Sequence, residues 1–215
     1  MFLQIYPLFG ILGTGLIILG IISSALLYRG RQGEHFSILN HFISELGEVG
    51  VSPAALLFNL GMILGGSILL PYMIGLGLRF SSLIGWLGSM TGVIASLGVI
   101  SVGIFPVNNL TAHIRAATTF FRAGLIMVFF FALAIIFQPA GPRSVPQSAN
   151  LFSLIAFIPY ATFVFISGRR YDQRPVNALD PQQDQERPRI SMLTILEWAV
   201  FFSTILWMLG MVLLI

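Results

Sequence analysis

Six long apolar stretches, separated by short polar segments, set the pattern of this sequence. Each is long enough to cross the hydrocarbon core of a bilayer as a helix, which requires about 20 apolar residues. We therefore predict an all-α integral membrane protein, a six-helix transmembrane bundle that makes up a single domain over residues 1–215. The predicted spans cover about residues 2–28, 53–78, 82–104, 112–137, 149–167 and 190–214.

A shorter segment with helical periodicity lies between the first two spans. At about 100° per residue, its apolar side chains fall on one side and its polar side chains on the other. It is too short and too polar to cross a membrane, so we predict a short amphipathic helix at the interface or against the mouth of the bundle. The segment covers residues 37–48, with Ile38, Leu39, Phe42, Ile43 and Leu46 on the apolar side and Ser37, Asn40, His41, Ser44, Glu45 and Glu48 on the polar side.

Two spans contain glycine spacings that allow helices to approach closely. Gly61 and Gly65 lie about one turn apart in the second span, and Gly88 and Gly92 lie in the same relation in the third. Such pairs let the backbones of neighbouring helices come into contact. We therefore expect the second and third spans to pack through these glycines.

The composition narrows the possible function classes. Hydrophobic residues make up 56% of the chain, charged residues make up 9%, and the mean hydropathy is +0.91. The formal charge is +3, but the eleven basic residues are all arginines scattered along the chain, so we predict no nucleic-acid partner. The chain has no cysteine, which excludes a disulfide and a thiolate nucleophile. The three histidines lack the spacing of a metal or haem site, and we predict no metal and no cofactor.

The loop arginines predict how the protein is oriented in its membrane. Six spans place both termini on one face and residues 29–52, 105–112 and 168–189 on the other, where the last segment is predicted to be a solvated loop. Arginine-rich loops stay in the cytoplasm, so we expect the second face to be cytoplasmic and both termini to be external. Its loop arginines are Arg29, Arg31, Arg169, Arg170, Arg174, Arg187 and Arg189, against Arg79 and Arg143 on the first face.

Polar residues that are scarce elsewhere gather on this second face. The first loop, the turn before the fourth span and the start of the sixth span all reach it, which favours a polar site for a lipid headgroup or small polar ligand. His41 and Glu45 are four residues apart and have the spacing of a proton-transfer pair, while the alternative is an ordinary wet helix face. His41 and His113 are the weak candidates for a catalytic base. The ligand-binding candidates are Asn40, Ser44, Glu45, Asn59, Asn108, His113, Arg115, Arg122 and Glu197.

Two charges inside the predicted spans are the most unusual members of this set. Arg122 lies about 13 Å past His113 along a helix, and an arginine at that depth is costly when it faces lipid. We therefore expect Arg122 to face the bundle interior, a wet cavity or a partner. Glu197 is the only carboxylate inside a predicted span, so we predict that it pairs with Arg122 or Arg115. Such a pair either lines a ligand pocket or satisfies two buried charges.

Short motifs are spread over most of the chain: Ile43-Ser44-Glu45-Leu46-Gly47, Ser52-Pro53, Phe58-Asn59, Gly103-Ile104-Phe105-Pro106 with His113, and Glu197-Trp198. Together they resemble the domain of unknown function 998 family, whose members are small prokaryotic integral membrane proteins. The resemblance implies a transmembrane bundle in a prokaryotic cell membrane, with a polar site built from the first loop, the turn before the fourth span and the last span. It implies no activity. The first-loop motif is also similar to the DRAM-like membrane proteins, in which that loop lies on the non-cytosolic side, opposite to the charge count.

Three hypotheses for function follow from these observations. The first is a non-enzymatic membrane protein that binds a lipid headgroup or a small polar ligand at the polar site. The second is an accessory subunit of a larger membrane complex, in which glycine-rich and phenylalanine-rich helix faces pack against other subunits. The third is a membrane-embedded hydrolase or transferase with His41 or His113 as base, for which the sequence offers no nucleophile motif. Membrane lipids are the expected partners in all three.

Overall fold

Six long helices make up most of the described chain. The structure is a computed structural model that describes residues 2–139, 141, 145–171 and 188–214. All six helices are long and apolar enough to cross a membrane, which confirms an all-helical integral membrane protein, and the described residues contain no strand. The helices are α1 (Phe2–Leu27), α2 (Ala55–Phe80), α3 (Leu83–Ile104), α4 (Leu110–Phe137), α5 (Asn150–Tyr171) and α6 (Met192–Leu214).

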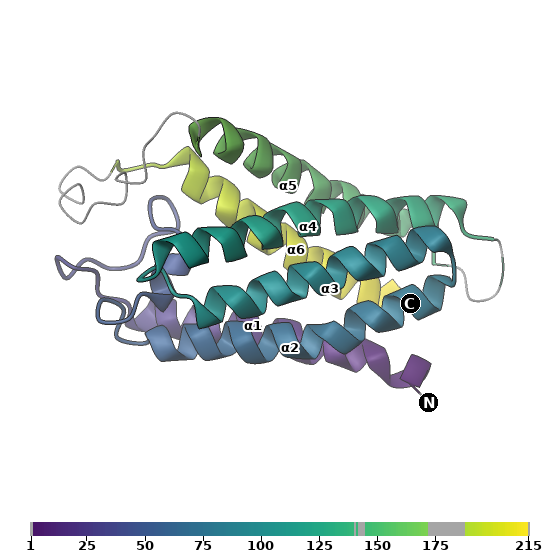
Figure 1. The fold of residues 1–215 in the computed structure, drawn as a ribbon, viewed down its shortest axis with the longest axis horizontal. Helices are drawn as coiled ribbons and strands as arrows, with labels where there is room; N and C mark the ends of the chain where they lie inside the picture. Colours follow the sequence, from purple (N-terminus) through teal and green to yellow (C-terminus); the bar gives the residue numbers. More distant parts are fainter. Residues whose placement is uncertain (1, 140, 142–144, 172–187, 215) are drawn as a thin grey trace.

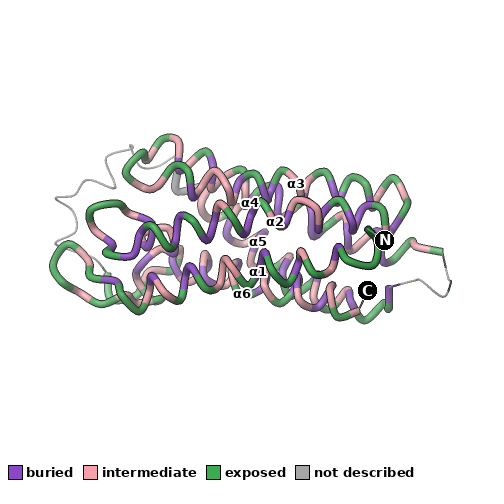
Figure 2. Tube along the Cα trace, turned by 90° about the horizontal axis from the view of Figure 1, so that it is seen from below, coloured by how far each residue is buried: buried purple, intermediate pink, exposed green. Residues whose placement is uncertain are grey.

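The helices lie side by side along one common direction (Figure 1). From α1 to α4 each helix packs against the next along the chain, and α6 contacts both α5 and α1. The two chain ends lie at one end of the bundle, and residues 28–54, 105–109 and 188–191 lie at the opposite end, which we call the loop end. Every helix carries both buried and exposed positions (Figure 2), as expected when one face lies inside the bundle and another faces lipid.

The loop end is the face that the arginine count predicts to be cytoplasmic. Arg29, Arg31 and Arg189 lie there, and Arg79 lies near the opposite end of α2. Most of the predicted solvated loop over residues 168–189 lies outside the described residues. The orientation in the membrane therefore stays a prediction.

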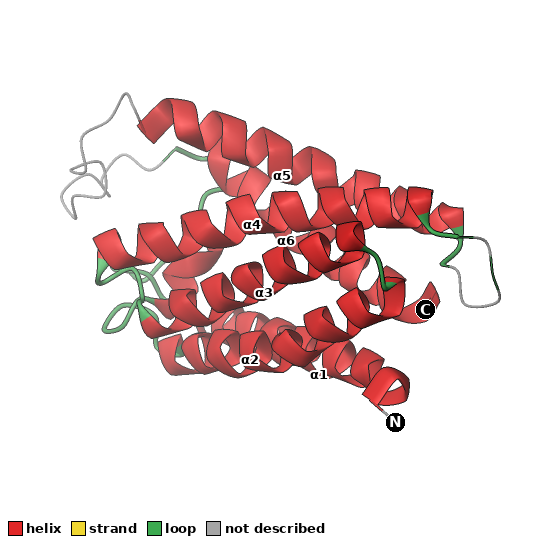
Figure 3. Ribbon diagram, turned by 45° about the vertical axis from the view of Figure 1, so that its right-hand side comes forward, coloured by secondary structure: helices red, strands yellow, loops and turns green. Residues whose placement is uncertain are grey.

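Close contact between α1 and α2 depends on glycines. A Cβ atom placed on Gly20 would lie 2.9 Å from the Leu57 carbonyl oxygen, and one placed on Gly65 would lie 2.7 Å from the Gly13 carbonyl oxygen. Neither position has room for a side chain. As predicted, α2 and α3 pack against each other (Figure 3), with Gly92 close to Met73. Gly61 and Gly65, however, face α1, because α1 carries matching glycines that let the two backbones approach.

The segment between α1 and α2 does not form the amphipathic α-helix predicted over residues 37–48. It makes a turn at residues 38–40 and then a short 3₁₀ helix, η1 (Ile43–Gly47). The side chains also depart from the predicted pattern, since Leu39 is 46% exposed and His41 is only 2% exposed. The apolar and polar sides expected of an interfacial helix are therefore not formed over this segment.

Contacts with the start of α6 explain why an α-helix is absent here. In an α-helix the Ile43 amide would donate to the Leu39 carbonyl. Instead the Ile43 amide donates to Glu197 at 2.8 Å, and the Leu39 carbonyl accepts from the Ser191 amide at 2.8 Å. Because buried backbone groups need one partner each, partners from the α6 region replace the local helical bond.

Candidate functional site

Three segments that are far apart in the sequence meet at the loop end. In the turn before α4, the side-chain amide of Asn108 accepts from the Val49 amide at 2.8 Å and donates to the Val49 carbonyl at 2.9 Å. Before α6, the Ser191 amide donates to the Leu39 carbonyl. The first loop, residues 28–54, is therefore tied to both other segments.

Side chains from α2 and α6 also fix η1 to the bundle. Asn59 of α2 donates from Nδ2 to the carbonyl of the last η1 residue at 3.1 Å. On α6, Glu197 Oε2 accepts from the Ile43 amide at 2.8 Å, and Trp198 Nε1 donates to the His41 carbonyl at 3.2 Å. These bonds give Asn59 and Glu197, two of the predicted site residues, a role in holding the first loop over the ends of the helices.

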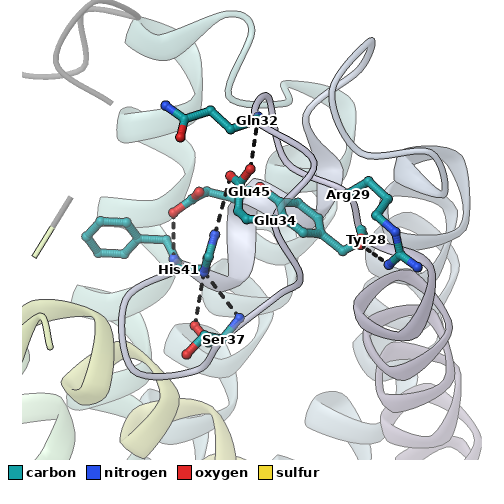
Figure 4. A network of polar contacts seen from close by, with 8 residues as sticks. Tyr28, Arg29, Gln32, Glu34, Ser37, His41 and Glu45 are labelled. Carbon is teal, nitrogen blue, oxygen red and sulfur yellow. Dashed lines mark hydrogen bonds and ion pairs between the residues drawn. The ribbon is translucent and has the colours of Figure 1, made fainter. Parts of the chain in front are cut away.

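His41 lies in an aromatic cluster, which we define as Tyr28, Phe36, His41 and Trp198. Its ring centroid is 5.4 Å from that of Tyr28 and 5.2 Å from that of Phe36, and Phe36 lies 5.8 Å from Trp198. His41 Nδ1 lies 3.2 Å from the Ser37 backbone nitrogen (Figure 4). The His41 ring thus packs within the first loop, and Phe36 packs this loop against Trp198 of α6. His41 does not line the cavity described below.

Carboxylates of the first loop serve the loop itself (Figure 4). Glu45 Oε1 accepts from the Phe42 amide at 2.8 Å, which caps the start of η1. Glu34 Oε2 accepts from the Gln32 amide at 2.9 Å, and Glu34 Oε1 lies 3.8 Å from His41 Nε2. The acidic partner that these contacts place beside His41 is therefore Glu34, a residue that sequence reasoning did not select.

A narrow cavity of about 120 Å³ runs inside the bundle. Residues from all six helices and from η1 line it, and most of them are apolar. Along α2 the lining extends from Phe58 to Met73, and along α6 from Glu197 to Met208. At a rise of 1.5 Å per residue these stretches cover about 22 Å and about 17 Å of helix. The cavity is therefore elongated and reaches from the loop end deep into the bundle.

Three polar residues line the loop end of this cavity, and we call them the cavity mouth. They are Ser44 on η1, His113 in the first turn of α4 and Glu197 in the second turn of α6. No arginine is among the described residues that line the cavity. The mouth therefore offers hydroxyl, imidazole and carboxyl groups without a basic counterpart.

The contacts of His113 define which of its ring atoms can act at the mouth. His113 is buried, and its Nδ1 lies 2.9 Å from the Phe105 carbonyl oxygen at the end of α3. A carbonyl can only accept, so we assign the proton of the neutral ring to Nδ1. The lone pair then lies on Nε2, which makes His113 a hydrogen-bond acceptor in the lining of the cavity that Glu197 also lines.

Deeper in the cavity, hydroxyl groups interrupt the apolar lining. The Thr204 Oγ1 lies 3.0 Å from the Tyr160 hydroxyl oxygen, and Thr14 Oγ1 has no hydrogen-bond partner among the described residues. Ser96 donates to its own helix at Gly92. Sequence reasoning missed these residues because a hydroxyl in a spanning helix can satisfy itself on the preceding turn and gives no periodic signal.

Arg115 and Arg122 lie on the outside of the bundle. Of the three surroundings predicted for Arg122, the bundle interior and a wet cavity are therefore wrong, and a contact with a partner stays a prediction. Both are exposed, and neither forms an ion pair with any described residue. The interior face of α4 is instead formed by uncharged apolar residues together with His113, and the ring of Tyr160 packs closely over Gly124 on this face. The predicted ion pair between Glu197 and either arginine is therefore absent from the described part of the chain.

The predicted ligand-binding residues thus separate into groups with different surroundings. Those that line the cavity are Ser44, His113 and Glu197; those that hold or form the first loop are Asn40, Glu45, Asn59 and Asn108; those on the outer face of α4 are Arg115 and Arg122. Only the first group can reach a molecule inside the bundle.

Comparison with known proteins gives a family and no activity. A family model described as "Protein of unknown function (DUF998)" matches residues 11–214. No match was found among curated proteins or among solved structures. The match covers α2 to α6 and most of α1, and thus nearly the whole chain, in agreement with the resemblance of the first-loop, Phe-Pro and Glu-Trp motifs. The chain belongs to the DUF998 family.

Proposed function

We propose that this protein binds an amphipathic molecule with a single hydrocarbon chain, which lies in the cavity with its polar end at the cavity mouth. The observation that carries the proposal is the distribution of groups along the cavity, with apolar walls over most of its length and Ser44, His113 and Glu197 gathered at one end. Ligand sites in proteins combine largely apolar walls with a few convergent polar groups in this way.

The groups at the mouth select the polar end of the ligand. Glu197 and the Nε2 atom of His113 can accept hydrogen bonds, and no arginine lines the cavity among the residues that the structure describes. An anionic end such as a phosphate or carboxylate would meet no counter-charge there, and burying an unpaired charge is costly. A hydroxyl or ammonium end can donate to these acceptors, so the ligand is a long-chain alcohol or amine in chemical class.

The size of the cavity limits the apolar part of the ligand. Its volume of about 120 Å³ is close to that of an engineered cavity of about 150 Å³ that takes up benzene. Because this volume is spread along the helices, one unbranched chain fits the shape better than a ring system or the paired chains of a phospholipid. A cavity of this size holds about six carbon atoms, as in benzene. A longer chain therefore enters only when flexible methionine side chains in the wall, such as Met62 and Met208, move aside.

Native mass spectrometry in dodecyl maltoside tests the proposal with hexadecanol, hexadecylamine and hexadecanoate as probes. We expect adducts of the alcohol and the amine and much less of the carboxylate. Ala117→Leu adds a larger side chain to the cavity wall and should abolish the adducts. Ala132→Leu makes the same change on α4 at a residue that does not line the cavity and should leave them intact.

Two results would overturn the proposal. One is equal binding of hexadecanoate and hexadecylamine, because that would show adsorption without selection at the mouth. The other is undiminished binding in Ala117→Leu. Since extra methylenes in a packed interior can also strain the fold, each variant is first checked for a monodisperse elution profile identical to that of the unmodified protein.

A further inference from the structure

The outer face of α4 carries an exposed stripe of side chains that are charged near one end of the helix and apolar near the other. Arg115, Arg122, Phe129 and Ile136 follow one another at intervals of seven residues, and all four are exposed. Residues seven apart lie on nearly the same side of a helix, because 3.6 residues make one turn. The stripe is therefore cationic toward the loop end and apolar toward the other end of the bundle.

The depth of Arg122 makes this stripe unusual for a surface that faces lipid. At 1.5 Å per residue, Arg115 lies about 8 Å and Arg122 about 18 Å from the start of α4 at the loop end. The helix has 28 residues and is about 42 Å long, which exceeds the roughly 30 Å hydrocarbon core by about 6 Å at each end. The Cα atom of Arg122 therefore lies well inside the hydrocarbon core, where an arginine without an anionic partner is costly.

Side-chain direction brings both guanidinium groups toward the same leaflet. The Cα–Cβ bonds of a helix tilt toward its N-terminus, and the N-terminus of α4 lies at the loop end. A long arginine side chain can extend its head toward the headgroup region while its methylenes stay along apolar surface. Thr118 and Thr119 lie between the two arginines, and the Thr119 hydroxyl donates to its own helix, at the Arg115 carbonyl.

We propose that the stripe binds one anionic phospholipid of the loop-end leaflet, with its phosphate between Arg115 and Arg122 and an acyl chain along Phe129 and Ile136. Arginine matches phosphate in charge and in bidentate geometry, and basic sites on membrane helices bind anionic headgroups. This site is separate from the cavity. It prefers an anionic group because the arginines of the stripe are hydrogen-bond donors, whereas the acceptors at the cavity mouth prefer a hydroxyl or ammonium group.

Lipid retention measured by native mass spectrometry tests the site. The protein is purified from nanodiscs that contain equal amounts of dioleoyl phosphatidylglycerol and dioleoyl phosphatidylcholine, and we expect an adduct with phosphatidylglycerol. In the double variant Arg115→Gln, Arg122→Gln the affinity should fall about twenty-five-fold, from roughly a factor of five for each arginine. Binding of hexadecanol in the cavity should stay unchanged, which separates this site from the proposed function.

Arg189→Gln is the matched control, because Arg189 is exposed at the same end of the bundle but does not belong to α4. If it weakens retention as much as Arg122→Gln does, the effect is one of overall charge and the site is refuted. Unchanged retention in the double variant also refutes it. A third contrary result is a dimer that Arg122→Gln converts to monomers, which would assign the stripe to a contact between proteins.

Discussion

The aromatic cluster and the cavity mouth lie at the same end of the protein and both contain a histidine, yet their surroundings differ. His41 is enclosed by aromatic rings and is 2% exposed, and its ring fixes the first loop. His113 is held through Nδ1 by the end of α3 but borders the cavity with the rest of its ring. The comparison shows that the packing around a histidine, more than the residue type, decides whether its ring is enclosed, as at His41, or left facing a cavity, as at His113.

Trp198→Ala would break the aromatic cluster and should have the largest effect on stability. It removes a 6% exposed indole that contacts Phe36 and donates to the His41 carbonyl. Truncation of a buried tryptophan costs about 3–5 kcal/mol. The expected result is a marked loss of the monodisperse protein that survives heating in detergent, measured by size-exclusion chromatography.

Trp86→Ala provides the control for that measurement. Trp86 is 40% exposed on α3 and does not belong to the aromatic cluster. Its truncation should therefore cost much less than that of Trp198. Equal losses in the two variants would mean that the aromatic cluster contributes no more to stability than a tryptophan at the lipid surface.

The spans were predictable from sequence, and the first loop was not. Length and apolar composition locate a spanning helix within a single stretch of sequence, and the six observed helices match six such stretches. The first loop depends instead on Glu197 and Trp198, which lie more than 150 residues away from the groups that they bind. No local periodicity records those partners, so the pattern over residues 37–48 predicted a helix that is not formed.

The error at Arg122 has a different physical cause. The helical periodicity of α4 correctly places Arg115 and Arg122 on one face and His113 and Gly124 on the other. Because an arginine is costly in lipid, we expected the face with the arginines to be the inner one. Close packing decides otherwise, because a Cβ atom at Gly124 would already lie 2.6 Å from the Tyr160 ring. An arginine on the outer face can extend its guanidinium group to the headgroup region. The close packing of Tyr160 against Gly124 requires a neighbouring helix, so Gly124 has to face the inside of the bundle.

Substitutions at Glu197 would sharpen the comparison, because this residue serves both the first loop and the cavity mouth. Glu197→Leu removes the acceptor of the Ile43 amide, which costs about 1–3 kcal/mol for a donor left unpaired. Glu197→Gln keeps a carbonyl acceptor and should cost less than about 1 kcal/mol. Heating in detergent and size-exclusion chromatography measure this difference in stability.

Ligand binding by Glu197→Gln tests the role of this residue at the cavity mouth. Glu197→Gln removes the carboxyl group from the mouth, so we expect hexadecylamine to bind about five-fold more weakly, because an ammonium bonds to a carboxylate more strongly than to an amide carbonyl by about 1 kcal/mol. Hexadecanol should bind almost as before. If both probes bind to Glu197→Gln as well as to the unmodified protein, Glu197 acts only in holding the first loop.

Asn108→Ala should produce the smallest effect, confined to the first loop. Its side chain makes two hydrogen bonds to Val49 at an exposed position, where the net contribution to stability is about 1 kcal/mol. Local opening of the first loop should increase by about five-fold, without a change in heat resistance of the bundle. Limited trypsin digestion measures this opening, because Arg29 and Arg31 lie in the first loop.

Asn109→Ala separates loop opening from damage to the turn before α4. Asn109 accepts from the Ala112 amide at 3.3 Å and thereby caps α4, but it makes no bond to the first loop. Its substitution costs about 1 kcal/mol at a helix start, similar to the cost at Asn108. Faster cleavage after Arg31 in Asn108→Ala alone would show that the bond to Val49 holds the first loop closed over the cavity mouth. Equal cleavage in both variants would place the control of the first loop in η1 and α6 instead.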